Sequence, residues 1–265
     1  MANDIRDVIF ASIQNNEYTA WLSAERAGVL SGIKRLQELL EARQINTTFY
    51  KKDGESVVAG ERILMLRGNP KEIASAEEFI IGVLSKTSGI ATAAYQAVCT
   101  AEPMRVVSGA WKKMPFEIKH LVREAVNHGG AQFRITDVPF LYLDKNFVGM
   151  LGGIKETLAA VTEMKELKVI QVKGDTGDIA KEALTAAEYG AGIIMVDTGR
   201  IEDFRKVNLL LKQTGYRAKV QLAFAKGVML HDIEMLKAEE IDILDIGVQI
   251  IDAPLLDMKL DVVRS

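Results

Sequence analysis

Short apolar runs in the second half of the chain end at charged or glycine residues, and chemistry could occur at these ends. The runs are Met104 to Val107 before Ser108-Gly109, Val169 to Val172 before Lys173-Gly174-Asp175, Ile193 to Val196 before Asp197-Thr198-Gly199-Arg200, Val220 to Phe224 before Ala225-Lys226-Gly227, and Ile243 to Ile246 before Gly247. In an α/β barrel the carboxyl ends of the strands meet at one mouth. The pattern therefore predicts that these scattered polar residues become neighbours.

The cationic residues predicted around this mouth would attract a phosphate-bearing ligand. They are Lys112, Lys113, Arg134, Lys173, Arg200 and Lys226. Glycines in the same regions permit tight turns and also allow backbone amides to approach a phosphate closely. Simpler interpretations stay open: Lys173 and Asp175 as a surface pair, and Asp197 as the cap of a helix that begins near Ile201.

The elements that would position these residues alternate between strand and helix from Pro103 onward. Helices are predicted at Phe116 to Asn127, Ile154 to Glu166, Ile179 to Tyr189, Glu202 to Thr214 and Asp232 to Ala238. Such alternation is typical of a parallel sheet covered by helices, and the almost wholly apolar strands favour a closed or nearly closed barrel. We therefore predict an α/β fold with a barrel domain over residues 103–265, whose C-terminal tail could return to the first domain.

The first part of the chain has a different pattern, which predicts a separate domain over residues 1–102. Thr19 to Leu40 is largely helical in composition after an early strand-like piece. Thr47 to Lys51 and Arg62 to Leu66 flank glycine-containing turns and are typical of a strand pair. Glu72 to Leu84 carries apolar residues at helical spacing, and a further helix is predicted through Val98.

Composition excludes several classes of protein. The 265 residues are 48% hydrophobic and 26% charged, which is typical of a globular protein and not of a disordered one. The net charge of -3 gives no electrostatic basis for binding nucleic acid, and Cys99, the single cysteine, excludes an internal disulfide framework. No run approaches the ~20 apolar residues needed to span a bilayer, so we expect no membrane partner and a cytoplasmic location.

Six short segments, spread in order over nearly the whole chain, form a set of motifs. They are Asp53-Gly54-Glu55-Ser56-Val57-Val58-Ala59-Gly60, Ser88-Gly89-Ile90-Ala91-Thr92, Gly129-Gly130, Val196-Asp197, Gly247 and Leu256-Asp257-Met258-Lys259-Leu260-Asp261. Together they resemble the quinolinate phosphoribosyltransferase family, also called nicotinate-nucleotide pyrophosphorylase. The resemblance implies an N-terminal α/β sandwich domain, an open α/β barrel and a dimer in which one subunit's N-terminal domain faces the other's barrel mouth. It also implies a reaction that joins quinolinate to phosphoribosyl pyrophosphate with magnesium, with loss of carbon dioxide.

The resemblance assigns roles to individual residues of this sequence. Asp197 matches the family's metal-side aspartate, so it is predicted to hold Mg²⁺ or to lie near the cationic sugar carbon. The candidate catalytic residues are Lys112, Lys173 and Asp197. The candidate substrate-binding residues are Glu78, Trp111, Lys113, Phe133, Arg134, Lys145, Asn146, Arg200, Lys226, Gly227 and Gly247.

Several of these positions depart from the family pattern. Glu78 stands where the family has an arginine that reaches the neighbouring subunit's substrate, and Lys173 stands in place of a glutamate. Trp111 replaces a substrate arginine and Phe133 a histidine. Asp144-Lys145 transposes a Lys-Asp pair, and alternation along a strand would point the two side chains to opposite sides. A carboxylate in place of an arginine turns attraction into repulsion, each worth up to ~4 kcal/mol at 4 Å with an effective dielectric near 20. We therefore expect the acceptor to differ from quinolinate.

Three functions remain open from the sequence. The first is transfer of a phosphoribosyl group to a nitrogen heterocycle other than quinolinate, with release of pyrophosphate, by a homodimer or higher homo-oligomer that uses Mg²⁺. The second is non-catalytic binding of a phosphorylated nucleotide-like ligand. The third is a lyase or isomerase reaction on a sugar phosphate, because barrel folds host many reactions.

Overall fold

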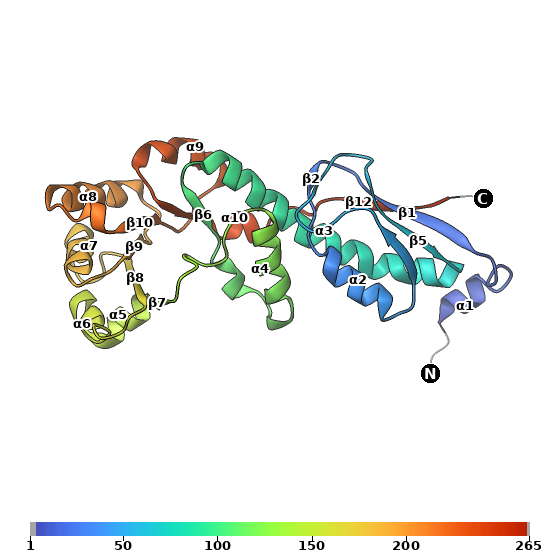
Figure 1. The fold of residues 1–265 in the computed structure, drawn as a ribbon, viewed down its shortest axis with the longest axis horizontal. Helices are drawn as coiled ribbons and strands as arrows, with labels where there is room; N and C mark the ends of the chain where they lie inside the picture. Colours follow the sequence, from blue (N-terminus) through green and yellow to red (C-terminus); the bar gives the residue numbers. More distant parts are fainter. Residues whose placement is uncertain (1–3, 264–265) are drawn as a thin grey trace. The chain divides into compact units, whose positions relative to one another are not determined.

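The structure is a computed structural model that describes residues 4–263, and its chain divides into two compact units (Figure 1). The first unit contains the chain up to Gln96, Met114–Gly130 and the chain from Ile250. The second contains Ala97–Lys113 and Ala131–Gln249. The division predicted at residues 102/103 differs from this one, because it places Met114–Gly130 with the barrel, whereas the chain from Ile250 lies in the first unit, the return that was allowed for the C-terminal tail.

A four-stranded antiparallel sheet forms the framework of the first unit. Its strands, in the order β12-β1-β5-β3, are β12 (Met258–Val263), β1 (Tyr18–Ala24), β5 (Arg62–Gly68) and β3 (Asn46–Phe49). A separate small ladder joins β2 (Gly28–Val29) to β4 (Ser56–Val57). The largely helical composition expected for Thr19 to Leu40 is wrong over β1, because this segment pairs with β5 on one side and with the last strand of the chain on the other.

Helices cover this sheet with apolar side chains. Those that pack on it are α2 (Ile33–Glu41) and α3 (Pro70–Ala101). The unit also contains α1 (Ile5–Ile9), which buries no residue, and α4 (Lys119–His128), which follows a 3-10 turn at Phe116–Ile118. Leu36 and Leu40 of α2 and Ile80 of α3 join Leu22 and Leu64 of the sheet in one buried cluster. A single helix replaces the two predicted between Glu72 and Val98, so the Ser88 to Thr92 motif lies inside α3.

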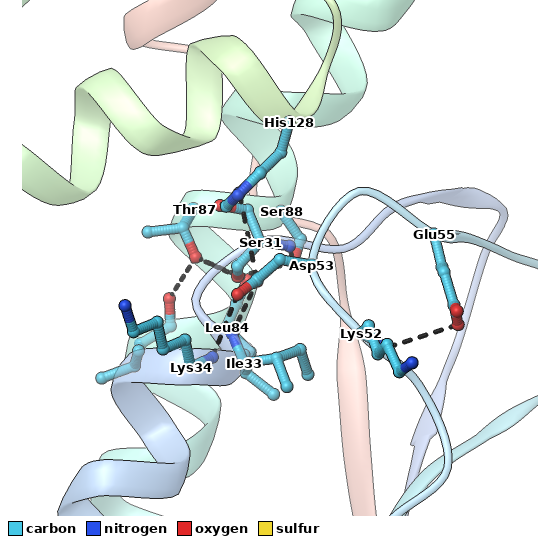
Figure 2. A network of polar contacts seen from close by, with 11 residues as sticks. Ser31, Ile33, Lys34, Lys52, Asp53, Glu55, Leu84, Thr87, Ser88 and His128 are labelled. Carbon is cyan, nitrogen blue, oxygen red and sulfur yellow. Dashed lines mark hydrogen bonds and ion pairs between the residues drawn. The ribbon is translucent and has the colours of Figure 1, made fainter.

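The motif residues of the first unit hold its loops to its helices, as Figure 2 shows. Asp53 accepts hydrogen bonds from the backbone N–H groups of Ile33 (2.8 Å) and Lys34 (3.0 Å), so a carboxylate from a distant loop caps the start of α2. Ser31 receives a hydrogen bond at its carbonyl from Ser88 and lies 2.9 Å from His128 Nδ1 through its hydroxyl. These contacts give the resembling motifs a structural role.

A six-stranded parallel sheet forms the second unit. Its strands, in the order β6-β11-β10-β9-β8-β7, are β6 (Arg105–Val107), β11 (Ile243–Asp245), β10 (Gln221–Phe224), β9 (Ile193–Val196), β8 (Leu167–Val172) and β7 (Phe140–Leu143). The strands β6 and β7 are the two edges, so the curled sheet is an open half-barrel, as the predicted open α/β barrel requires. All four residues of β9 are buried, as expected for a strand covered on both faces.

Helices follow most of these strands and cover the sheet (Figure 1). They are α5 (Lys145–Leu151), α6 (Ile154–Ala159), α7 (Ile179–Glu188), α8 (Ile201–Gln213), α9 (Ile233–Leu236) and the short α10 (Val248–Ile251). The helices predicted to end at Glu166 and Ala238 end earlier, at Ala159 and Leu236. Within residues 4–263, the chain forms no helix with the length and apolar character that crossing a membrane requires.

Candidate active site

A cavity of about 450 Å³ lies where the carboxyl ends of the parallel strands meet. Six of the residues singled out in the sequence line it: Lys112, Lys113, Asp197, Lys226, Gly227 and Gly247. They come from the segments after four different strands, β6, β9, β10 and β11. The fold therefore brings these separate parts of the sequence to one concave surface within the second unit.

The short 3-10 turn Ala110–Lys113 supplies two of the cationic side chains. The ammonium nitrogen of Lys112 lies 4.6 Å from the centre of the Tyr142 ring, and Lys113 is exposed. The turn is fixed at its start, because the backbone N–H of Gly109 donates to Asp245 Oδ1 at 3.2 Å. The two lysines are thus attached to a held segment, and both are exposed, so their charged ends are accessible to anionic ligand groups.

The turns after β9 and β10 touch one another at the edge of the cavity. The backbone N–H of Gly199 donates to the carbonyl of Ala225 at 3.2 Å. Gly199 has a φ of +73°, and a Cβ at this position would lie 2.5 Å from the carbonyl oxygen of Lys226. Lys226 itself has a φ of +79°, which is unusual for a residue with a side chain. The close approach requires glycine at position 199.

We expect Gly199→Ala to destabilise the protein by at least about 2 kcal/mol and to weaken phosphate binding, because the clash would move the Lys226 turn. Gly215→Ala is the matched control, since Gly215 has a φ of +75° but no atom within 4 Å of the added Cβ. Denaturant unfolding and ribose 5-phosphate titration are measured for both variants. Both carry the backbone strain of a positive φ, and only Gly199→Ala adds the clash with Lys226. Equal losses of stability and affinity in the two variants would contradict the expectation.

Asp197, the first residue after β9, has a fixed carboxylate. Lys173 Nζ lies 3.7 Å from Asp197 Oδ2, and the side-chain amide of Gln171 donates to the same oxygen. The side chains of Lys173 and Asp197 are only about one-fifth exposed, at 20% and 19%. The part of the chain that the structure describes offers Oδ1 of Asp197 no hydrogen-bond partner. This oxygen is therefore available to a ligand or a cation.

A second carboxylate holds the loop that carries Lys173. Glu182, on α7, accepts hydrogen bonds from the backbone N–H groups of Lys173 (3.2 Å) and Gly174 (2.8 Å) and from both the N–H and the hydroxyl of Thr176. Glu182 is buried. The loop after β8 is thus held by hydrogen bonds to one carboxylate, and its residue Lys173 pairs with Asp197.

Two residues that the sequence interpretation missed also line the cavity, Tyr142 of β7 and Asp245 of β11. Burial raises the pKa of Asp245 from its usual 3.8 to about 6, an effect increased by the charge of Asp197 and opposed by the Gly109 N–H, Lys112 and Lys113. Burial likewise raises the pKa of the Tyr142 hydroxyl, which stays protonated and lies 3.1 Å from the sulfur of Met195. An aspartate inside the otherwise apolar run Ile243 to Ile246 was the signal that could have identified Asp245.

Phe133 contacts both Trp111 and Arg134, and none of the three is among the residues that line the cavity. The indole N–H of Trp111 donates to the carbonyl of Phe133 at 2.8 Å, and the two rings meet edge to face with centres 6.2 Å apart. The Arg134 guanidinium lies 5.7 Å from the centre of the Phe133 ring. The aromatic pair therefore forms a packed group of its own within the second unit.

Lys145 and Asn146 begin helix α5 and are exposed. Asp144 caps this helix, because its carboxylate accepts from the backbone N–H groups of Asn146 (2.8 Å) and Phe147 (3.2 Å). The expectation that Asp144 and Lys145 alternate along a strand is wrong, since β7 ends at Leu143. Neither Lys145 nor Asn146 lines the cavity.

Arg200 and Glu78 have partners of their own. Arg200 forms an ion pair with Asp203 at 2.7 Å on the first turn of α8 and is not part of the cavity wall. Glu78, an exposed residue of α3 in the first unit, pairs with Arg6 of α1 at 2.8 Å. The negative charge introduced at Glu78 is thus partly balanced within its own unit.

Two family models match the chain. The model "Quinolinate phosphoribosyl transferase, N-terminal domain" matches residues 7–88, and the model of the same family's C-terminal domain matches residues 90–261. A probable carboxylating nicotinate-nucleotide pyrophosphorylase of Archaeoglobus fulgidus is 28% identical over 258 residues, 96% of this chain and 97% of that protein. The putative pyrophosphorylase ModD of Pasteurella multocida is 25% identical over 79% of this chain and 74% of its own length. The solved nicotinate-nucleotide pyrophosphorylase of Francisella tularensis has the same fold, with a TM-score of 0.82 at 20% identity over 99% of this chain and 91% of that one. The resemblance seen in the sequence is confirmed, and the chain belongs to the quinolinate phosphoribosyl transferase family.

Proposed function

We propose that this protein transfers the phosphoribosyl group of phosphoribosyl pyrophosphate to a nitrogen heterocycle other than quinolinate, and releases pyrophosphate. The observation that carries the proposal is the joint presence of Lys112, Lys113, Lys226 and Asp197 around one cavity in a member of this family. In the reaction, the bond between the sugar carbon and pyrophosphate breaks with its electron pair leaving on pyrophosphate. A ring nitrogen of the acceptor then supplies the pair for the new bond.

The charges in the cavity suit both ends of this reaction. Lys112, Lys113 and Lys226 would bind the phosphate groups, and a lysine beside the leaving pyrophosphate would stabilise its growing negative charge. Asp197 would lie near the sugar carbon, where positive charge develops in the transition state. Lys173 would act as a positioning residue, because it fixes Asp197 by the ion pair.

The residues present are compatible with magnesium as part of the proposal. Among residues 4–263 there is no group of three or more His, Cys, Asp or Glu side chains that could hold a metal by itself. Mg²⁺ is commonly bound by one or two carboxylates together with substrate phosphates, and Asp197 offers the oxygen Oδ1. The ion would supply positive charge to the pyrophosphate, while Asp197 would hold it in the cavity.

The proposal that the acceptor is not quinolinate rests on charge. Quinolinate brings two carboxylates in addition to the phosphate groups that Lys112, Lys113 and Lys226 would bind, and the cavity wall also carries two carboxylates of its own, Asp197 and Asp245. Glu78, paired with Arg6, stands where the resemblance implies an arginine, so this position supplies no positive charge for an acceptor carboxylate. Among the relatives, the Pasteurella multocida protein is named only as a pyrophosphorylase, without a stated acceptor.

The test is pyrophosphate release from phosphoribosyl pyrophosphate and Mg²⁺ across a panel of pyridines, purines, pyrimidines and azoles, quinolinate included. We expect release with an acceptor that lacks the two adjacent carboxylates, and a mass-identified ribosylated product. Release with quinolinate alone would refute the proposed acceptor class. Tight binding of a phosphorylated ligand without pyrophosphate release would indicate a non-catalytic binding protein. A product formed without loss of pyrophosphate would indicate a lyase or isomerase.

We expect Lys112→Ala to weaken binding of phosphoribosyl pyrophosphate by about 10- to 100-fold, the effect of losing one charged hydrogen bond. Isothermal titration calorimetry with Mg²⁺ present measures the change. Lys165→Ala is the matched control, because Lys165 is exposed and precedes β8, at the other end of the strands from the cavity. Unchanged affinity in Lys112→Ala, or an equal loss in both variants, would count against the role of Lys112.

The proposal includes a homodimer, which the family resemblance implies, located in the cytoplasm. Light scattering of the purified chain measures the assembly, and a monomer at working concentration would remove this part of the proposal without affecting the chemistry of the cavity.

A further inference from the structure

Asp245 is the charged residue of the cavity wall that belongs to a strand, whereas Lys112, Lys113, Asp197 and Lys226 lie in segments that follow strands. It ends β11, the strand between β6 and β10, so its side chain starts deep in the sheet and not from a loop. One oxygen, Oδ1, is fixed by the backbone N–H of Gly109 at 3.2 Å. Within the described part of the chain Oδ2 has no hydrogen-bond partner, and the residue lines the cavity. Asp245 is half-buried, and a carboxylate oxygen with no protein donor that faces a cavity is open to a ligand that brings a donor.

The surrounding charges narrow the choice of that ligand group. Asp197 repels further negative charge near Asp245, whereas Lys112 and Lys113, in the turn after β6, favour the charged form of Asp245 itself. Tyr142, whose ring is covered by Lys112, adds an aromatic wall from β7. A flat ring with an N–H donor satisfies Oδ2, whereas a ring carboxylate in the same place would meet a like charge.

We infer that Asp245 determines acceptor specificity by accepting a hydrogen bond from an N–H group of the heterocycle, so that the protein selects rings bearing an amide, an amine or a protonated ring nitrogen over rings bearing a carboxylate. This inference rests on the proposed function and names the chemical class of its acceptor. Asp245 is a specificity-determining residue, because it distinguishes acceptor rings by a hydrogen bond and takes no part in breaking the bond to pyrophosphate.

The experiment compares rings that differ in one group. Nicotinamide is paired with nicotinate, and imidazole-4-carboxamide with imidazole-4-carboxylate. Each is titrated into the full chain by ligand-observed NMR with ribose 5-phosphate present, first with the wild type and then with Asp245→Asn. Asparagine keeps the size of the side chain and an acceptor for Gly109 but removes the charge. Asp252→Asn is the control, because Asp252 is exposed and does not line the cavity.

We expect the wild type to bind at least one amide ring about 10- to 100-fold more tightly than its carboxylate partner, as a hydrogen bond to a charged group predicts. In Asp245→Asn the preference should fall to near unity, and Asp252→Asn should behave as the wild type. Asp245→Ser, which removes the carboxyl group and shortens the side chain, should also lower the preference for amide rings.

Three results would overturn the inference: equal or tighter binding of the carboxylate rings by the wild type, an unchanged preference in Asp245→Asn, or no binding of any of these rings. Failure of the proposed function has a separate signature, since ribose 5-phosphate alone would then not bind. If ribose 5-phosphate binds and the ring preference is absent, only the role of Asp245 is wrong.

Discussion

Asp197→Asn is expected to lower the rate constant for phosphoribosyl transfer by about 100- to 1000-fold, the usual loss when one preorganised electrostatic group of an active site is removed. The negative charge of Asp197 would act chiefly in the transition state, when the sugar carbon becomes cationic. Asparagine preserves the shape and can still accept from Gln171, whereas it removes the counter-charge of Lys173. The effect should therefore appear in kcat more than in binding of phosphoribosyl pyrophosphate.

The measurement is steady-state pyrophosphate release with the acceptor found in the panel, combined with calorimetry of phosphoribosyl pyrophosphate with and without Mg²⁺. A loss confined to affinity in the presence of Mg²⁺ would assign Asp197 to metal binding alone. Asp175→Asn tests the neighbouring loop, because Asp175 is an exposed aspartate two residues after Lys173. Should Asp197→Asn retain kcat within about threefold of the wild type, the electrostatic role is wrong.

The second unit could be predicted well from the sequence because its strands are short, apolar and bounded by polar or glycine residues. Val169 to Val172 and Ile193 to Val196 are strands in the structure. The carboxyl ends of parallel strands lie on one edge whatever the details of the sheet, so the grouping of Lys112, Asp197 and Lys226 follows from fold class alone. The structure shows the grouping; the roles of these residues remain predictions.

The first unit was harder because its pairings are distant in sequence. The strand β1 is stabilised by β12, the last strand of the chain, and the start of α2 is capped by Asp53 from a loop about twenty residues further on. Neither partner leaves a local signal in the segment from Thr19 to Leu40. Composition alone therefore favoured a helix where tertiary pairing stabilises a strand.

The direction of the side chains at the strand ends could not be predicted from the sequence. The positions of Trp111 and Arg200 in the sequence place them next to the cavity, but one donates to the Phe133 carbonyl and the other to Asp203. Conversely, Asp245 lies in an apolar run and was passed over as part of a strand. The direction of a side chain at a strand end depends on packing against residues distant in sequence. The spacing of nearby residues therefore does not predict it.

The half-buried carboxylate of Asp245 should cost the folded protein stability at neutral pH. Its pKa is raised from the usual 3.8 to about 6, first by burial. Between these two pH values the folded state binds more protons than the unfolded state, so the free energy of unfolding falls as pH rises through this window and stays low above it. The difference between the two pKa values corresponds to about 3 kcal/mol, an upper figure for a side chain that keeps some contact with water.

Asp245→Asn should therefore be more stable than the wild type by about 1 to 3 kcal/mol at pH 7 to 8, and the two should unfold alike near pH 4. Denaturant unfolding followed by circular dichroism at several pH values measures the difference, with Asp252→Asn expected to show none. A gain of stability at neutral pH that is accompanied by loss of ring discrimination would mean that the chain retains a destabilising charge for function, as active sites commonly do. A difference that is constant with pH, or that grows toward acid, would show that Asp245 is not held in its charged form at a cost, and that its place at the end of β11 serves packing alone.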